Sequence, residues 1–135
     1  MPAKPLATKT IRQSATFKAT PAAVYDLLMD SKKHAATTDH KASISPKVGG
    51  KISAYDGYIE GVNVELMAGK RIVQTWRSPE WPKGHYSEVR FELSKAPGGC
   101  KLDFTQTGVP AKEYEELKQG WIDFYWDKMK AYLKG

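Results

Sequence analysis

The sequence contains little that could cross-link, export or anchor the chain. It has one cysteine, Cys100, so an intramolecular disulfide is impossible. No stretch approaches the roughly 20 consecutive apolar residues of a membrane-spanning helix, and the opening residues, MPAKPLATK, lack the apolar segment of a secretory signal. A chain of 135 residues is long enough to build its own apolar core without a disulfide or a metal. We therefore expect a soluble, cytoplasmic protein with no membrane partner.

A long block of basic residues is also missing, although the formal net charge is +6. The 21 lysines and arginines are interspersed with the 15 aspartates and glutamates. A modest positive charge favours acidic partners and speeds association with them, but nucleic-acid-binding proteins usually concentrate that charge in a patch or stripe. The sequence therefore argues against a protein dedicated to binding nucleic acid.

Residue patterns typical of catalysis, cofactor binding or metal binding are absent as well. No Ser-His-Asp or Cys-His arrangement stands out, and Gly49-Gly50 is typical of a hairpin turn rather than of a phosphate-binding loop. His34, Asp39 and His40 fall across a predicted helix-to-loop junction and match no metal-ligand spacing. The sequence therefore predicts no enzymatic activity, no cofactor and no metal site.

What the sequence does contain is a long amphipathic segment at residues 111–133. Its large apolar residues recur in steps of three and four, which places them on one face of a helix: Tyr114, Leu117, Trp121, Phe124, Tyr125, Met129, Tyr132 and Leu133. A helix of about 23 residues is roughly 35 Å long, so this face needs a large apolar partner. Gly120 is unfavourable inside a helix. It either lets a strand or a ligand approach beside Trp121 or is a tolerated weak position.

The rest of the chain is predicted to supply that partner. Residues 8–18 alternate in polarity like a half-buried strand, and two short helices follow, the first starting at Thr20-Pro21 and the second at residues 31–36. Turn signals then separate six strand-like runs at 42–47, 51–55, 58–67, 70–77, 84–95 and 100–108. Short connections imply antiparallel pairing. We predict a single α+β domain over residues 1–135, with a flexible arm at 1–7, in which a curved sheet of about six or seven strands wraps the C-terminal helix.

Several short motifs occur in a fixed order within these predicted elements. They are Val48-Gly49-Gly50-Lys51, Asp56-Gly57-Tyr58-Ile59-Glu60-Gly61, Ile72-Val73-Gln74-Thr75-Trp76-Arg77, Trp81-Pro82-Lys83-Gly84-His85-Tyr86-Ser87, Thr107-Gly108-Val109-Pro110, and Gly120-Trp121 with Tyr125-Trp126. In this order and spacing they resemble the activator of Hsp90 ATPase family, whose members have the helix-grip fold of START-like (SRPBCC) domains. The resemblance runs from about residue 10 to the end of the chain.

The resemblance is strongest to the C-terminal domain of the family's eukaryotic co-chaperone. It implies a non-enzymatic, co-chaperone-like module that binds an Hsp90-type chaperone and stimulates its ATPase. In the full co-chaperone a separate N-terminal domain makes the main contact with the chaperone, and the resemblance implies that this domain is missing here. The family also implies a cavity between sheet and helix. The alternative function is therefore a carrier or sensor of a hydrophobic, lipid-like small molecule.

The segment between two predicted strands, residues 76–85, is the candidate for partner binding. Two prolines restrict its backbone, and tryptophan and arginine are common anchors of protein interfaces. The candidate contact residues are Trp76, Arg77, Trp81, Pro82 and Lys83. The alternative is that Trp76 belongs to the core and Trp81 folds back onto the helix.

The candidate cavity residues come from the predicted sheet and helix: His85, Phe91, Phe104, Trp121, Phe124 and Tyr125. In a closed pocket of about a few hundred Å³, His85 would be a polar contact, together with Arg77 or Tyr125. Otherwise His85 is a buried histidine bonded to a backbone carbonyl or to Tyr125, and the aromatic residues form a solid core. The sequence leaves both possibilities open.

Overall fold

The computed structural model describes residues 7–133, so residues 1–6 of the predicted flexible arm lie outside the described part. The order of elements is the one predicted. Strand β1 (Thr8–Phe17) is followed by helices α1 (Pro21–Met29) and α2 (Ser31–Thr38). Six strands come next: β2 (Ser43–Ile44), β3 (Lys51–Ala54), β4 (Ile59–Met67), β5 (Arg71–Trp76), β6 (Ser87–Ala96) and β7 (Gly99–Pro110).

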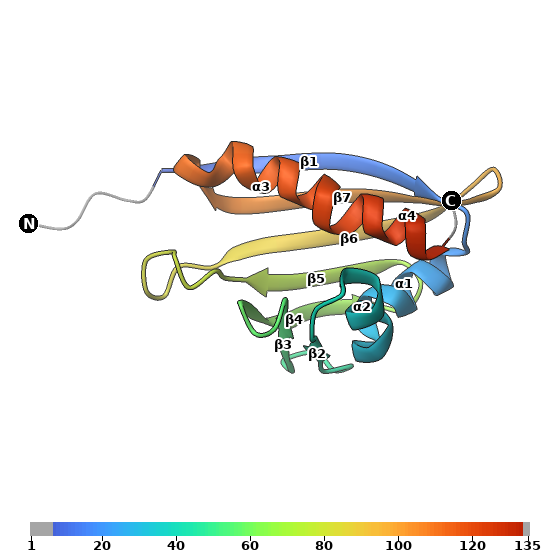
Figure 1. Ribbon diagram of the computed structural model, residues 1–135, viewed down its shortest axis with the longest axis horizontal. Coiled ribbons are helices and arrows are strands. Elements are labelled where there is room, and N and C mark those ends of the chain that lie inside the picture. The colour runs from blue at the N-terminus through green and yellow to red at the C-terminus, as the bar shows by residue number, and fades with distance from the viewer. Residues whose placement is uncertain (1–6, 134–135) are drawn as a thin grey trace, which may run out of the picture.

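The strands form one curved antiparallel sheet of seven strands in the order β1-β7-β6-β5-β4-β3-β2 (Figure 1). Each strand from β2 to β6 pairs with the next one along the chain, because the connecting turns are short. The first strand, β1, instead pairs with the last, β7. The C-terminal helix lies across one face of this sheet, and α1 and α2 pack beside it (Figure 1). The helix-grip prediction is confirmed.

The C-terminal helix contains a π-helical turn that its sequence period does not indicate. It consists of a 3₁₀ turn, η1 (Ala111–Glu113), helix α3 (Tyr114–Trp121), the π turn η2 (Ile122–Trp126) and helix α4 (Asp127–Leu133). The wider turn shifts which side chains face the sheet. Phe124, predicted to face inward, is 53% exposed, whereas Trp126 is 4% exposed. Tyr132, in the last described turn, is exposed as well.

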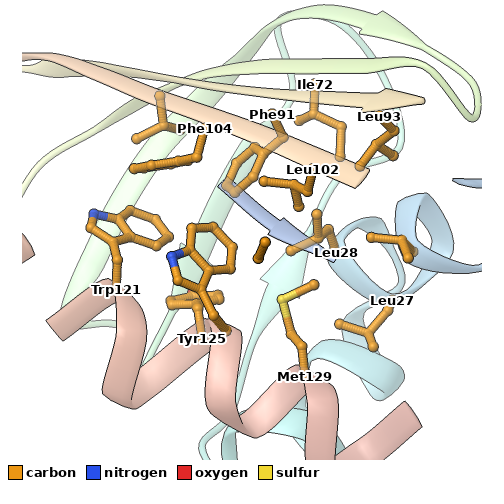
Figure 2. Packing of buried hydrophobic residues seen from close by; sticks show 14 of the residues in the cluster. Leu27, Leu28, Ile72, Phe91, Leu93, Leu102, Phe104, Trp121, Tyr125 and Met129 are labelled. Carbon is orange, nitrogen blue, oxygen red and sulfur yellow. The ribbon is translucent and has the colours of Figure 1, made fainter. Parts of the chain in front are cut away.

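The core fills the space between the sheet and the middle of this helix (Figure 2). Phe91 from β6 and Phe104 from β7 meet Trp121, whose ring centroid lies 4.2 Å from that of Phe104. Leu28 from α1 and Met129 from α4 continue the cluster beyond the aromatic residues. Burial of each large apolar side chain contributes about 1.5–3 kcal/mol, so this contact explains why the helix stays on the sheet.

No helix within residues 7–133 has both the length and the apolar character needed to span a bilayer.

Candidate functional site

A pocket of about 460 Å³ lies between the sheet and the first half of the C-terminal helix. Its buried aromatic lining residues are Trp76 from β5, Trp81 from the loop after β5, and Trp121 and Tyr125 from the helix, and the buried polar residues Ser78 and Gln106 line it as well. Tyr58 and Phe124 line its mouth and are 45% and 53% exposed. The expectation of a closed cavity is therefore wrong, because side chains that line the pocket also reach the surface.

Two of the three buried indole rings of the pocket, those of Trp76 and Trp121, are fixed by a network of hydrogen bonds. The Nε1–H of Trp121 donates to Oε1 of Gln106 (2.7 Å), and the Gln106 amide donates to Oγ of Ser87 (2.8 Å). The Ser87 hydroxyl in turn donates to the backbone carbonyl of Trp76 (3.0 Å), whose own Nε1–H donates to Oε1 of Gln74 (2.8 Å). Trp76 and Trp121 therefore turn their ring faces, rather than their N–H groups, toward the pocket.

Tyr125 is bonded to a buried histidine, but that residue is His34 and not His85. His34 Nδ1 lies 3.2 Å from the backbone carbonyl of Leu28, which only accepts hydrogen bonds, so Nδ1 carries the proton. The Tyr125 hydroxyl, 2.9 Å from Nε2, then donates to that nitrogen. Burial lowers the pKa of His34 and raises the pKa of Tyr125. The pair is neutral and holds the Tyr125 ring against the pocket.

The turn between β3 and β4 forms one side of the pocket mouth. Tyr55, Asp56 and Gly57 have consecutive positive φ angles of 52°, 61° and 89°, a costly conformation for the first two residues. The Tyr55 hydroxyl donates to the backbone carbonyl of Phe124 (2.6 Å), which ties the turn to the helix. The Asp56 carboxylate accepts from Nδ1 of His40 (2.8 Å), and this bond is the main cause of the lowered pKa of Asp56.

These contacts account for the residues considered as metal ligands. His34 is bonded to Leu28 and Tyr125, and His40 is bonded to Asp56. Within residues 7–133 no group of three or more histidine, cysteine, aspartate or glutamate side chains is placed to hold a metal ion.

Acidic side chains gather at the pocket, although the whole chain is basic. Asp56, Glu80, Glu113 and Glu116 are among its lining residues. Glu80 accepts a hydrogen bond of 2.6 Å from the Tyr58 hydroxyl. None of the ion pairs formed between residues 7–133 includes Glu80, Glu113 or Glu116. Arg77 is the only lysine or arginine among the lining residues, so the pocket lining carries more negative than positive formal charge.

The loop that joins β5 to β6 forms the other side of the mouth and is clamped from within. The Arg77 guanidinium donates to the backbone carbonyls of Pro82 (2.6 Å), Trp81 (3.2 Å) and His85 (3.2 Å). Trp81 is only 6% exposed and packs edge-on against the ring of His85. Pro82 and Lys83 are exposed at the tip of this loop. It projects beyond the end of the sheet (Figure 1).

His85 does not line the pocket, contrary to the prediction. The strand predicted at 84–95 included His85, but β6 begins only at Ser87, so His85 lies in the preceding loop. The preceding loop turns the imidazole aside, and its Nε2 donates to the backbone carbonyl of Gly108 (2.7 Å). The alternative in which His85 is bonded to a backbone carbonyl describes what the structure shows.

Six of the residues predicted for partner binding or for the cavity line one pocket, and four besides His85 do not. Three members of the partner-binding set and three of the cavity set line the same pocket: Trp76, Arg77 and Trp81, with Trp121, Phe124 and Tyr125. Phe91 and Phe104 instead belong to the filled core (Figure 2), and they are not among the lining residues. Pro82 and Lys83 are exposed and outside the pocket.

Sequence reasoning missed Tyr55, Tyr58 and the carboxylates of the mouth. The sequence does indicate that two of these carboxylates lie together, because Glu113, Glu116 and Gly120 are spaced by three and four residues and share a helix face. A Cβ atom at Gly120 would meet only the Phe124 ring, at 3.6 Å, so no strand requires a glycine there. Gly120 instead widens the pocket beside Trp121.

Comparison with known proteins identifies the family of this chain. Residues 18–134 match the family described as Activator of Hsp90 ATPase homolog 1-like protein. The chain is 35% identical over 130 residues to the Activator of 90 kDa heat shock protein ATPase homolog of Dictyostelium discoideum, covering 96% of this chain and 34% of that protein. It is 30% identical over 115 residues to homolog 1 of Homo sapiens, covering 85% of this chain and 34% of that protein. The chain thus spans about a third of the length of these relatives.

Solved structures show the same fold. An HSP90 activator from Plasmodium falciparum superimposes with a TM-score of 0.85 at 25% identity, covering 93% of this chain and 96% of the other. The Aha1 dimer from Colwellia psychrerythraea has a TM-score of 0.80 at 17% identity, covering 93% and 96%, and supports the fold alone. By its sequence match over residues 18–134, this START-like chain belongs to the Activator of Hsp90 ATPase homolog 1-like family.

Proposed function

We propose that this protein is a non-enzymatic co-chaperone module that binds an Hsp90-type chaperone and stimulates its ATPase. The observation that carries the proposal is the family match over residues 18–134, together with relatives named as activators of the 90 kDa heat shock protein ATPase. Because the chain spans about a third of those relatives, the proposal concerns the activity of this part of them.

The loop at residues 77–86 is the surface that we propose for the chaperone. Its backbone is already ordered by the three hydrogen bonds from Arg77, so binding costs little additional conformational entropy. Lys83 is exposed at its tip, and Tyr86 is 47% exposed with its ring 6.0 Å from the Arg77 guanidinium carbon. A partly exposed tyrosine beside basic side chains suits an acidic patch with an apolar centre.

Stimulation requires that the protein bind one conformation of the chaperone more tightly than another. A partner shifts an equilibrium only by its difference in affinity for the two states. We propose that the loop binds the closed, ATP-competent arrangement preferentially. The net charge of +6 speeds the encounter with an acidic surface, and this contribution weakens as salt is added.

The test measures the ATPase rate of the Hsp90-type chaperone from the same organism as this protein is added, at low and at physiological salt. The loop variant combines Lys83→Ala with Tyr86→Ala, two exposed positions whose truncation leaves the core intact. The matched control is Lys95→Ala, an exposed lysine near the β6–β7 turn at the other end of the sheet.

We expect a saturable rise in ATPase rate with the wild-type protein. The loop variant should need at least about tenfold more protein for half of the effect, since interface anchors contribute about 2 kcal/mol or more. The Lys95→Ala variant should behave like the wild type. An unchanged ATPase rate at both salt concentrations, with no binding by calorimetry, would contradict the proposal. Equal losses in the loop variant and in the control would exclude the loop as the contact.

The pocket favours a second candidate function, the binding of a small molecule with an apolar body. Its volume of about 460 Å³ falls within the range of roughly 300–1,000 Å³ that is typical of ligand sites. Most of its deep wall is aromatic. Calorimetry with 3-phenyl-1-propanol tests this function, and a ligand that binds only the folded state must also raise the midpoint of thermal unfolding. Saturable binding supports the function, and the absence of binding by this alcohol and by its ammonium and carboxylate analogues contradicts it.

A further inference from the structure

Three buried aromatic residues of the pocket wall, Trp76, Trp121 and Tyr125, have polar hydrogens that already have acceptors. Trp121 donates to Gln106, Trp76 donates to Gln74, and the Tyr125 hydroxyl donates to His34. A ligand in this part of the pocket therefore meets the π faces and not the N–H or O–H groups. Such faces attract cations within about 6 Å of a ring centroid, because the face of an aromatic ring carries partial negative charge.

The mouth of the pocket adds full negative charges to this wall. Glu113 and Glu116 approach it from the start of the C-terminal helix and Glu80 from the β5–β6 loop. The ion pairs between residues 7–133 include none of these three carboxylates. A cationic group at the mouth would therefore gain favourable charge interactions with carboxylates that form no ion pair within the described part of the chain.

The positive groups near the pocket are engaged elsewhere. Arg77 directs its guanidinium to three carbonyls of its own loop, and His40 is bonded to Asp56. Lys128 lies 5.9 Å from the centroid of the Phe124 ring, but its ammonium donates to the carbonyl of Thr38 (2.9 Å). A carboxylate ligand such as a fatty acid would thus face several carboxylates and no uncommitted cation from this set.

We infer that the ligand of this pocket is an organic cation: an ammonium group attached to an apolar body. The apolar body would pack on Trp76, Trp121 and Tyr125, and the ammonium would lie among Glu80, Glu113 and Glu116. The inference rests on the second proposed function, because it specifies the chemical class of a small molecule that fits a pocket of about 460 Å³. It replaces the lipid-like ligand expected from the sequence.

The test compares three probes that share a phenylpropyl body and differ in charge. They are (3-phenylpropyl)trimethylammonium, 3-phenyl-1-propanol and 4-phenylbutanoate. Each is titrated into the full chain by calorimetry at low salt, and the indole N–H signals of the four tryptophans are followed by NMR to place the binding. We expect the ammonium probe to bind at least about tenfold more tightly than the alcohol, the butanoate to bind most weakly, and the differences to shrink as salt is added.

Charge variants at the mouth separate this inference from general electrostatic attraction. The combined Glu113→Gln and Glu116→Gln variant should weaken the ammonium probe by about tenfold, or about threefold for each carboxylate, and leave the alcohol unchanged. The control is Glu115→Gln, which changes the charge at an exposed neighbouring residue that does not line the pocket. It should leave both probes unchanged.

The possible outcomes distinguish the inference from the function on which it rests. If the alcohol and the ammonium probe bind equally, or the mouth variant has no effect, the preference for cations is wrong and the small-molecule pocket stands. If the butanoate binds most tightly, the preference is also wrong. If none of the three probes binds, both the inference and the second proposed function fail.

Discussion

At the scale of single residues, His34 is the side chain whose protonation the fold opposes most directly. It is 4% exposed, and both ring nitrogens are bonded. Protonation of Nε2 would replace the acceptor of the Tyr125 hydroxyl with a second donor, inside the core and next to the pocket. The folded state therefore favours the neutral imidazole, as the lowered pKa of His34 indicates.

We predict that the free energy of unfolding decreases as the pH falls below about 6.5, the pKa of a histidine in an unfolded chain. Because the folded pKa of His34 is lower, the unfolded state binds more protons in this window, and stability rises with pH there. The contribution of His34 to stability is complete above the unfolded pKa and is lost as the pH falls from there toward the lower folded pKa.

Urea unfolding at closely spaced pH values measures this loss of stability. A His34→Gln variant should be less stable at pH 7 and should show a shallower pH dependence. Equal slopes for the two proteins would contradict the assignment.

The hydrogen-bonded pair of His34 and Tyr125 also shows what the sequence could not predict at the residue scale. The hydrogen bond joins residues 91 positions apart, and no local pattern reports a contact of that range. The same bond was considered for His85, because the predicted strand at 84–95 placed that residue in the sheet, whereas β6 begins at Ser87. A buried histidine bonded to Tyr125 was among the alternatives considered, but the histidine in that position is His34. Glu113 and Glu116 of the mouth were not singled out from the sequence, since their common helix face matters only once a pocket is known to lie beside it.

At the scale of elements, the bounds of helices and strands followed well from the sequence, but the register of the last helix did not. The turn residues and alternating runs are local signals, so they identified every strand, including β1. The π turn is a tertiary effect. Trp126 stacks on Trp121 at 5.5 Å and 21°, and its indole N–H donates to Oε1 of Gln13 in β1 (2.7 Å). These contacts favour the wider turn over a regular helix that would bury Phe124.

We predict that Trp126→Ala lowers the free energy of unfolding by about 3–5 kcal/mol, because it removes a buried aromatic ring. Phe124→Ala should cost less than about 1 kcal/mol, because that ring is more than half exposed. Both variants are compared with the wild type by urea unfolding, and circular dichroism of the folded variants checks that the helix is retained. The opposite order of the two losses would mean that the helix is regular and that the π turn is absent in solution.

At the scale of the whole molecule, the sheet is much longer on one side than on the other. Strands β1, β6 and β7 have 10, 10 and 12 residues, whereas β2 and β3 have 2 and 4. The C-terminal helix and the aromatic core cover the long strands, and the turn of the pocket mouth follows the short ones (Figure 1). The site is therefore built across a boundary between the most and the least extensively paired parts of the sheet.

We predict that this boundary separates two rates of backbone amide exchange in the native protein. Amides of β7, such as those of Leu102 and Phe104, should exchange only when the whole molecule unfolds, because β7 lies between two long strands. Amides of β2 and β3, such as the Ser45 amide that follows β2 and donates to the Lys51 carbonyl (3.0 Å), should open locally, with a free energy lower by at least about 2 kcal/mol. Hydrogen exchange followed by NMR measures both sets.

Lower opening free energies at β2 and β3 would mean that a ligand reaches the aromatic wall by a local movement of the mouth. Saturation with a pocket ligand should then slow amide exchange in β2 and β3 before it slows exchange in β7. Equal free energies throughout the sheet would contradict this, because the mouth would then open only with global unfolding.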